Sequence, residues 1–206
     1  MRFNRSAIMR IESDMKKIIS VICLIVILQG CVVFIGGAAI GAATASAVLY
    51  DRRPTKTIVN DENISYQVTQ ALQADHAIAS QCHVGVTAYN QVVLLVGQAP
   101  TQALKDQISM AAKTIPGITK LYNEVTIEAP STNLVQTSDA WVTTKVKSYL
   151  LTAKGLDSGQ FKVVTENGTV YLMGIASRDQ ANLAVEQARQ VEGVQKVVTV
   201  FEYQRD

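Results

Sequence analysis

The feature that most constrains the fold of this chain is an internal repeat. The segment "VGVTAYNQVVLLVGQA" at 84–99 aligns without gaps on "FKVVTENGTVYLMGIA" at 161–176. The flanking segments repeat as well, with "IPGITKLYNEV" matching "VEGVQKVVTVF" and the apolar residues Ile64, Val68 and Leu72 matching Val142, Val146 and Leu150. A repeat of this length is one structural unit used twice. The sequence therefore predicts two similar domains, at 63–128 and 139–206.

Each repeat predicts the same order of elements. Apolar residues at helical spacing open it, and two runs of alternating apolar residues follow as a β-hairpin. The hairpin turn of the second repeat is Asn167-Gly168, the preferred type I′ pair. A second amphipathic helix follows and is stopped by Gly117 or Gly193, before a last strand at 118–127 or 194–203.

The predicted order is thus αββαβ, an α+β fold. Because the last strand follows a helix, we expect it to run parallel to one strand of the hairpin. Each repeat then forms a small, mixed, three-stranded sheet with two helices packed on one face.

The N-terminal region resembles a bacterial lipoprotein leader. Met15-Lys16-Lys17 precedes an eleven-residue apolar run at 18–28, the dimensions of a secretory signal, so residues 1–30 are predicted to be a signal peptide that starts at Met15 or Met9. The run ends in "LQGC", which resembles a lipobox ending at Cys31. That resemblance implies a diacylglycerol and an N-acyl chain, such as palmitate, on Cys31, and Val32 after it implies sorting to the outer membrane.

A transmembrane helix over 18–40 is the alternative, since this run is long enough to span a bilayer. We favour the lipobox because Gly30, Gly36, Gly37 and Gly41 interrupt the run. Residues 31–62 are then predicted to be a tether, which ends in a polar linker at 50–63. Residues 129–138 are predicted to be a second linker.

Composition limits the function classes. The formal net charge of +2 comes from the leader, because residues 31–206 hold 14 Lys/Arg and 15 Asp/Glu, which argues against a nucleic-acid partner. The spacing of His76, Cys82 and His83 matches no familiar metal site. No catalytic arrangement or nucleotide-binding loop has credible spacing either. We therefore expect a binding protein without enzymatic activity, metal or cofactor.

The repeats resemble the BON domain. The resemblance lies in the apolar residues of the first helix, in the strand segments "VVLLVGQA" and "VYLMGIA", and in the closing segments "IPGITKLYNEV" and "VEGVQKVVTVF". A lipobox followed by two such domains is similar to tandem BON-domain lipoproteins of the Gram-negative outer membrane. The resemblance implies a periplasm-facing protein that supports outer-membrane integrity, including at the division site. It also implies binding of an anionic phospholipid such as phosphatidylglycerol or cardiolipin.

Trp141 is the clearest candidate for a binding residue. It opens the first helix of the second repeat, in "SDAWVTTKVKSYLL", where the first repeat has Asn63. We expect Ser138 or Asp139 to cap this helix and form its start. The residues expected to be buried are Val142, Val146, Tyr149 and Leu150. Trp141 is then left near the surface.

An aromatic side chain beside lysines is suited to the headgroup level of an anionic membrane. The family resemblance implies that five residues of the helix contact the lipid: Trp141, Thr144, Lys145, Lys147 and Ser148. Two alternatives remain at this point. Trp141 could pack against the first domain. The domains could instead form an adaptor that docks on outer-membrane assembly or peptidoglycan-remodelling proteins, with Tyr89 and Asn90 in the contact.

Overall fold

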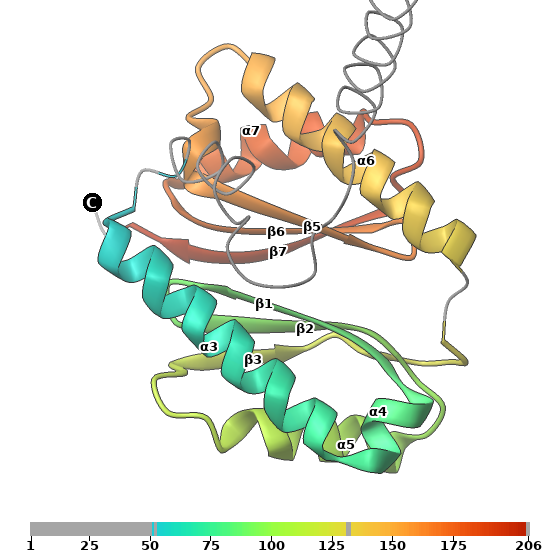
Figure 1. Ribbon diagram of the computed structural model, residues 1–206. Coiled ribbons are helices and arrows are strands. Elements are labelled where there is room, and N and C mark those ends of the chain that lie inside the picture. Colours follow the sequence, from blue (N-terminus) through green and yellow to red (C-terminus); the bar gives the residue numbers. More distant parts are fainter. Residues whose placement is uncertain (1–50, 52, 131–132, 205–206) are drawn as a thin grey trace, which may run out of the picture. The chain divides into compact units, whose positions relative to one another are not determined.

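The structure, a computed structural model, describes residue 51 and residues 53–130 and 133–204 (Figure 1). All of these belong to one compact unit, Ser46–Asp206. The predicted signal peptide, Cys31 and the alternative spanning segment at 18–40 lie outside the described residues.

Both repeats contain the predicted helices and hairpins. The elements of the first repeat are α3 (Thr55–Ala74), α4 (His76–Gln81), β1 (His83–Tyr89), β2 (Val92–Ala99), α5 (Gln102–Lys113), β3 (Lys120–Asn123) and β4 (Thr126–Ile127). Those of the second are α6 (Asn133–Thr152), the 3-10 helix η1 (Ser158–Gln160), β5 (Phe161–Glu166), β6 (Thr169–Ala176), α7 (Arg178–Arg189) and β7 (Lys196–Tyr203). The α+β class is confirmed.

The sheets are mixed, as predicted. In the first, β2 lies between β1, which is antiparallel to it, and β3, which is parallel. In the second, β6 lies between antiparallel β5 and parallel β7. β4 also pairs with β2 and keeps the register of β3, since Val92 faces Lys120 and Gln98 faces Thr126. The last strand of the first repeat is therefore one strand interrupted at 124–125, whereas β7 is continuous.

The helices of each repeat cover one face of its own sheet. In the first repeat, Val68 of α3 and Ile108 of α5 pack on Val93 and Leu95 of β2. In the second, Val146 of α6 and Ala188 of α7 pack with Leu172 of β6 in the same way. These residues are fully buried, so each repeat has a hydrophobic core of its own.

A third cluster joins the faces of the two sheets that the helices leave uncovered. It contains residues of both repeats, namely Tyr89, Val92, Leu94, Val96, Tyr171, Met173 and Val200. Every residue of β2 is buried as a result. The two repeats thus form a sheet-on-sheet sandwich with helices on its outer faces (Figure 1).

The first helix of each repeat begins earlier than we expected. α3 starts at Thr55 and α6 at Asn133, so parts of the segments predicted as linkers, 50–63 and 129–138, are helical. The reason in α3 is that its apolar stripe extends toward the N-terminus, where Ile58 is also buried. The polar composition of these first turns concealed the helical pattern.

Candidate functional site

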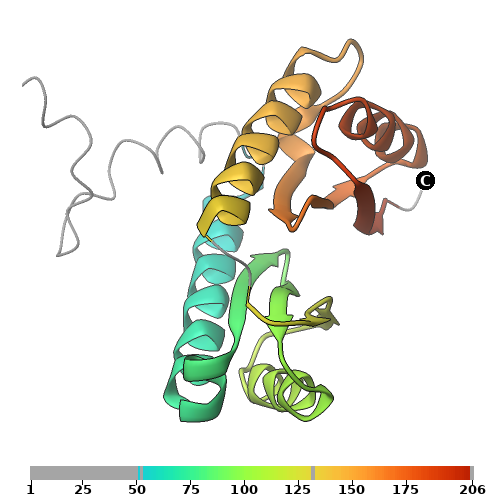
Figure 2. The same ribbon diagram turned by 90° about the vertical axis from the view of Figure 1, so that its right-hand side faces the viewer.

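Four of the five predicted lipid-contact residues lie on one face of α6, a helix that packs on its sheet beside α7 (Figure 2). Trp141, Thr144, Lys145 and Ser148 are spaced i, i+3, i+4 and i+7, which places them on one side of a helix. The buried residues Val142, Val146 and Leu150 take the opposite side. Lys147 is exposed at the flank of this face. We call these five residues the α6 face.

Trp141 is at the surface of the protein. Its side chain is 51% exposed, and the ammonium of Lys145 lies 3.6 Å from the centre of its ring. The same ammonium is 3.6 Å from the carboxylate of Glu192, which follows α7. The ring is half exposed, contacts Lys145 of its own helix, and is not part of the cluster that joins the two sheets.

Two further apolar side chains of α6 are exposed, and sequence reasoning missed both. Tyr149, which we expected to be buried, is 42% exposed, and Leu151 is 52% exposed. The buried stripe is centred on Val146 and Leu150, and Tyr149 lies about 100° around the helix from Leu150. Together with Trp141 they give α6 three large apolar side chains at the protein surface.

A buried carboxylate fixes which side of α6 faces outward. Asp139 was expected at the helix cap, but it lies inside the helix and is 7% exposed. It accepts hydrogen bonds from the backbone N–H groups of Asn167 (2.7 Å) and Gly168 (2.9 Å), in the turn between β5 and β6. Successive residues are about 100° apart on a helix, so Trp141, two residues after Asp139, lies about 200° around it. Holding Asp139 inward therefore turns Trp141 outward.

The first repeat uses the same arrangement. Asp61 of α3, at the position equivalent to Asp139, accepts from the backbone N–H groups of Asn90 (2.7 Å) and Gln91 (2.8 Å). The exposed face of α3 nevertheless differs in chemistry. It carries Val59 and Tyr66, each 63% exposed, but has no Lys or Arg from residue 57 to its end.

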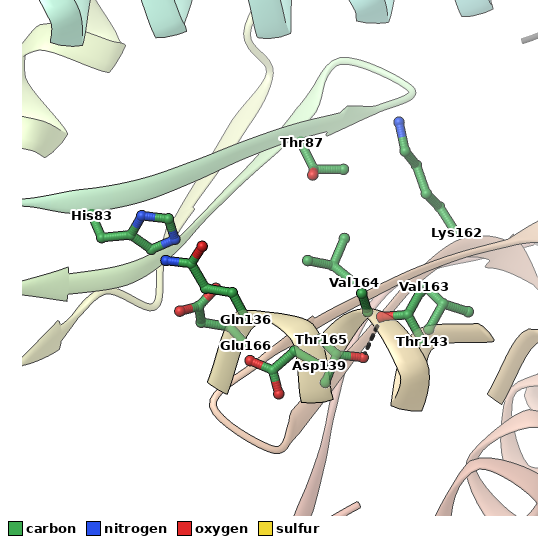
Figure 3. Close-up of a pocket in the computed structure, with 11 residues that line it drawn as sticks. His83, Thr87, Gln136, Asp139, Thr143, Lys162, Val163, Val164, Thr165 and Glu166 are labelled. Carbon is green, nitrogen blue, oxygen red and sulfur yellow. Dashed lines mark hydrogen bonds between the residues drawn. The ribbon is translucent and has the colours of Figure 1, made fainter. Parts of the chain in front are cut away.

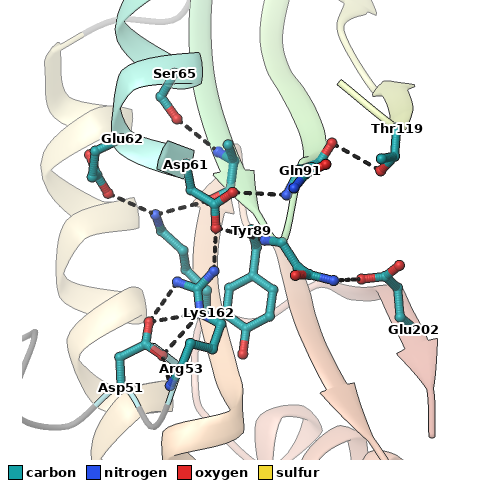
Figure 4. A network of polar contacts seen from close by, with 12 residues as sticks. Asp51, Arg53, Asp61, Glu62, Ser65, Tyr89, Gln91, Thr119, Lys162 and Glu202 are labelled. Atoms are coloured by element: carbon teal, nitrogen blue, oxygen red, sulfur yellow. Dashed lines mark hydrogen bonds and ion pairs between the residues drawn. The ribbon is translucent and has the colours of Figure 1, made fainter. Parts of the chain in front are cut away.

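Arg53 connects α3 with the region where the sheets meet (Figure 4). Its guanidinium pairs with Asp51 and Asp61 and lies 3.6 Å from the centre of the Tyr89 ring. Burial acts to raise the pKa of Asp51, but the hydrogen bonds and charge of Arg53 outweigh it and hold that pKa below its ordinary value. For Tyr89 burial dominates and raises the pKa to about 12.

The Tyr89–Asn90 surface is used within the protein. The Tyr89 hydroxyl donates to the carbonyl of Gln160 (2.8 Å), and the Asn90 amide donates to Glu202 (2.8 Å), both in the second repeat. Tyr89 is only 4% exposed. A docking contact centred on these two residues, the form in which we considered an adaptor, is therefore occupied by the other repeat.

A groove of about 420 Å³ lies between β1, β5 and α6 (Figure 3). Most of its charged groups already have partners. Asp139 binds the hairpin turn, Glu166 accepts from Gln98 (2.7 Å), and Lys162 donates to Glu62 (3.4 Å). Among the described residues, no group of three or more His, Cys, Asp and Glu side chains is placed to hold a metal ion. This groove has no arrangement that indicates a reaction.

Among the helices of residues 53–130 and 133–204, none is both long enough and apolar enough to cross a membrane.

Comparison with known proteins identifies the family. The sequence model of the BON-domain family matches residues 60–129 and again 138–205, which are the two repeats. This chain belongs to the BON-domain family. Its expected fold, two tandem BON domains, is therefore confirmed.

Similar full-length proteins support the same assignment. The chain is 37% identical over 192 residues to outer membrane lipoprotein DolP of Haemophilus influenzae, covering 93% of this chain and 97% of that protein. It is 39% identical over 154 residues to a 21 kDa hemolysin of Actinobacillus pleuropneumoniae, covering 74% of this chain and 79% of that one.

A solved structure of CdsD, a structural protein of the type III secretion system of Chlamydia trachomatis, is also similar in part. It is 13% identical, with a TM-score of 0.28, and the match covers 69% of this chain and 63% of that one. A similarity at this level carries no argument about function.

Proposed function

We propose that this protein is a periplasm-facing lipoprotein of the Gram-negative outer membrane that supports envelope integrity by binding anionic phospholipid. Cys31 carries the lipid anchor, and the α6 face makes the second contact, with phosphatidylglycerol or cardiolipin. The similarity to a protein named outer membrane lipoprotein DolP supports the location. The protein acts by binding, without a catalytic step.

The observation that carries the lipid proposal is the half-exposed Trp141 with the Lys145 ammonium against its ring. An indole is amphipathic and favours the boundary between headgroups and acyl chains. A lysine near an anionic surface contributes about 1 kcal/mol, and Lys147 adds a second exposed cation. Tyr149 and Leu151 extend the apolar area beside them.

The anchor allows the α6 face to be weak on its own. A protein already tethered to a membrane meets its lipid headgroups at a high effective concentration. Two cations and a few exposed apolar side chains are then sufficient to favour regions rich in anionic lipid over neutral ones.

The substitution Trp141→Glu tests the lipid contact. It removes the indole and places a negative charge next to Lys145, so we expect binding to fall at least about tenfold, the effect of about 1.4 kcal/mol. The measurement is co-sedimentation of the unlipidated fragment 46–206 with phosphatidylcholine vesicles that contain phosphatidylglycerol. Pure phosphatidylcholine vesicles give the background.

Tyr66→Glu is the matched control. Tyr66 is an exposed aromatic residue on the corresponding helix of the first repeat, where no lysine accompanies it. We expect this variant to bind like the wild type. Equal binding by wild type and Trp141→Glu would overturn the lipid proposal, and an equal loss in both variants would show that any added charge has the same effect.

Replacing Cys31 by Ala tests the anchor separately. We expect the variant to lose metabolic labelling with palmitate and to leave the outer-membrane fraction, because it has no thiol to acylate. If the variant stayed in the membrane after an alkaline wash, the spanning segment at 18–40 would be the better explanation.

A further inference from the structure

Lys145, the central cation of the α6 face, is already in contact with an anion of the protein. Its ammonium lies 3.6 Å from the Glu192 carboxylate as well as 3.6 Å from the centre of the Trp141 ring. Glu192 is 87% exposed, whereas Lys145 is 35% exposed. The acidic group is thus the outer member of the pair and stands where a lipid headgroup would approach.

The pair belongs to the second repeat alone. At the positions equivalent to Lys145 and Glu192, the first repeat has Gln67 and Pro116. Trp141 likewise replaces an asparagine of the first repeat. The aromatic ring, the cation and the anion therefore occur together on one repeat, and the fold as such requires none of them.

An exposed ion pair of this length contributes little to stability, so its partners exchange readily. A phosphate headgroup that binds Lys145 competes with Glu192 for the same ammonium. The carboxylate also repels the anionic surface as the helix approaches. Both effects oppose binding, so a membrane must present more anionic headgroups before the attractive contacts of the α6 face outweigh them.

We propose that Glu192 is a specificity-determining residue that sets how anionic a membrane must be before the α6 face binds it. This inference rests on the proposed lipid contact and deepens it. Glu192 weakens binding whatever the anionic lipid content, so more anionic lipid is needed for half-maximal binding than would be needed without this carboxylate. Its role is to make the contact selective.

The test is Glu192→Gln in the fragment 46–206, a compact unit with its own hydrophobic cores. The chain has a single tryptophan, so Trp141 fluorescence reports directly on the contact. The probes are phosphatidylcholine vesicles in which phosphatidylglycerol makes up about one tenth or about one half of the lipid. We expect Glu192→Gln to tighten binding about fivefold, the effect of about 1 kcal/mol, on the sparse vesicles and by at least as much on the rich ones, so that less phosphatidylglycerol is needed for half-maximal binding.

Glu186→Gln is the matched control, because Glu186 is exposed on α7 and its replacement changes the net charge equally. We expect it to tighten binding less than Glu192→Gln does. In a background of Lys145→Gln, the effect of Glu192→Gln should shrink to that of Glu186→Gln, since the pair no longer exists. Equal effects of the two glutamate changes in the wild-type background would overturn the inference.

The outcomes also separate this inference from the proposed function. If the wild-type fragment binds neither vesicle, or if Trp141→Glu binds as well as wild type, the lipid contact itself is wrong. If the wild type binds and Trp141→Glu does not, but Glu192→Gln behaves like Glu186→Gln, only the role of Glu192 is wrong.

Discussion

At the scale of single residues, the most informative positions are the two equivalent aspartates, Asp61 and Asp139. Each is buried on the first helix of its repeat and binds two backbone N–H groups of a hairpin turn. A buried carboxylate is costly unless its oxygens accept hydrogen bonds, and here both do. One side chain thereby satisfies a tight turn and fixes the rotation of a helix.

Asp139→Asn should destabilise the protein by about 2 kcal/mol, because an amide keeps one acceptor and points its NH₂ at a backbone donor. The loss is measured as a lower midpoint of urea unfolding with an unchanged slope. Asp106→Asn is the control, since Asp106 makes an exposed contact with Gln102. Its expected cost is below about 0.5 kcal/mol, and equal midpoints for the two variants would contradict the assignment.

At the scale of elements, sequence patterns predicted the hairpins and second helices well. Alternation and helical spacing are complete in these segments, and Asn167-Gly168 has the positive φ angles, 47° and 69°, of the expected turn. The corresponding turn of the first repeat was harder to predict. Gln91 adopts φ 65° without being glycine, as the second position of a type I′ turn requires, and its backbone N–H donates a hydrogen bond to Asp61.

The candidate site was predictable in part. Trp141 and Lys145 follow from the departure of one repeat from the other, which a single sequence contains. Tyr149 was assigned to the buried stripe because it lies near that stripe, and its exposure depends on the exact rotation of α6. The contact between Lys145 and Glu192 joins two elements, so no local pattern indicates it.

At the scale of the whole molecule, the main feature is the buried cluster that joins the two sheets. The unbroken apolar run of β2 is typical of a strand that is buried on both faces, but it does not say what covers the second face. In the structure, Tyr171 of the second sheet is part of that cover, and Tyr89 of the first sheet belongs to the same buried cluster. Burial raises the pKa of each phenol to about 12.

These tyrosines predict a loss of stability in alkali. Between pH 10 and about 12 the unfolded chain releases the phenol protons while the folded protein retains them, so stability falls as pH rises through this window. Tyr171→Phe should make this fall shallower, because one such group is removed. The measurement is the urea midpoint of wild type and variant across the window, and parallel curves would contradict a buried, protonated Tyr171.

The contacts of Arg53 with Asp51, Asp61 and Tyr89 have a practical consequence for the design of shorter fragments of the protein. The family match begins at residue 60, inside α3, so a fragment that starts there lacks Asp51 and Arg53. Its Asp61 carboxylate would lose its cation, and the Tyr89 ring would lose the guanidinium stacked on it. Fragment boundaries for this protein should therefore be set by the ion pairs ahead of the first helix, and not by the limits of the sequence match.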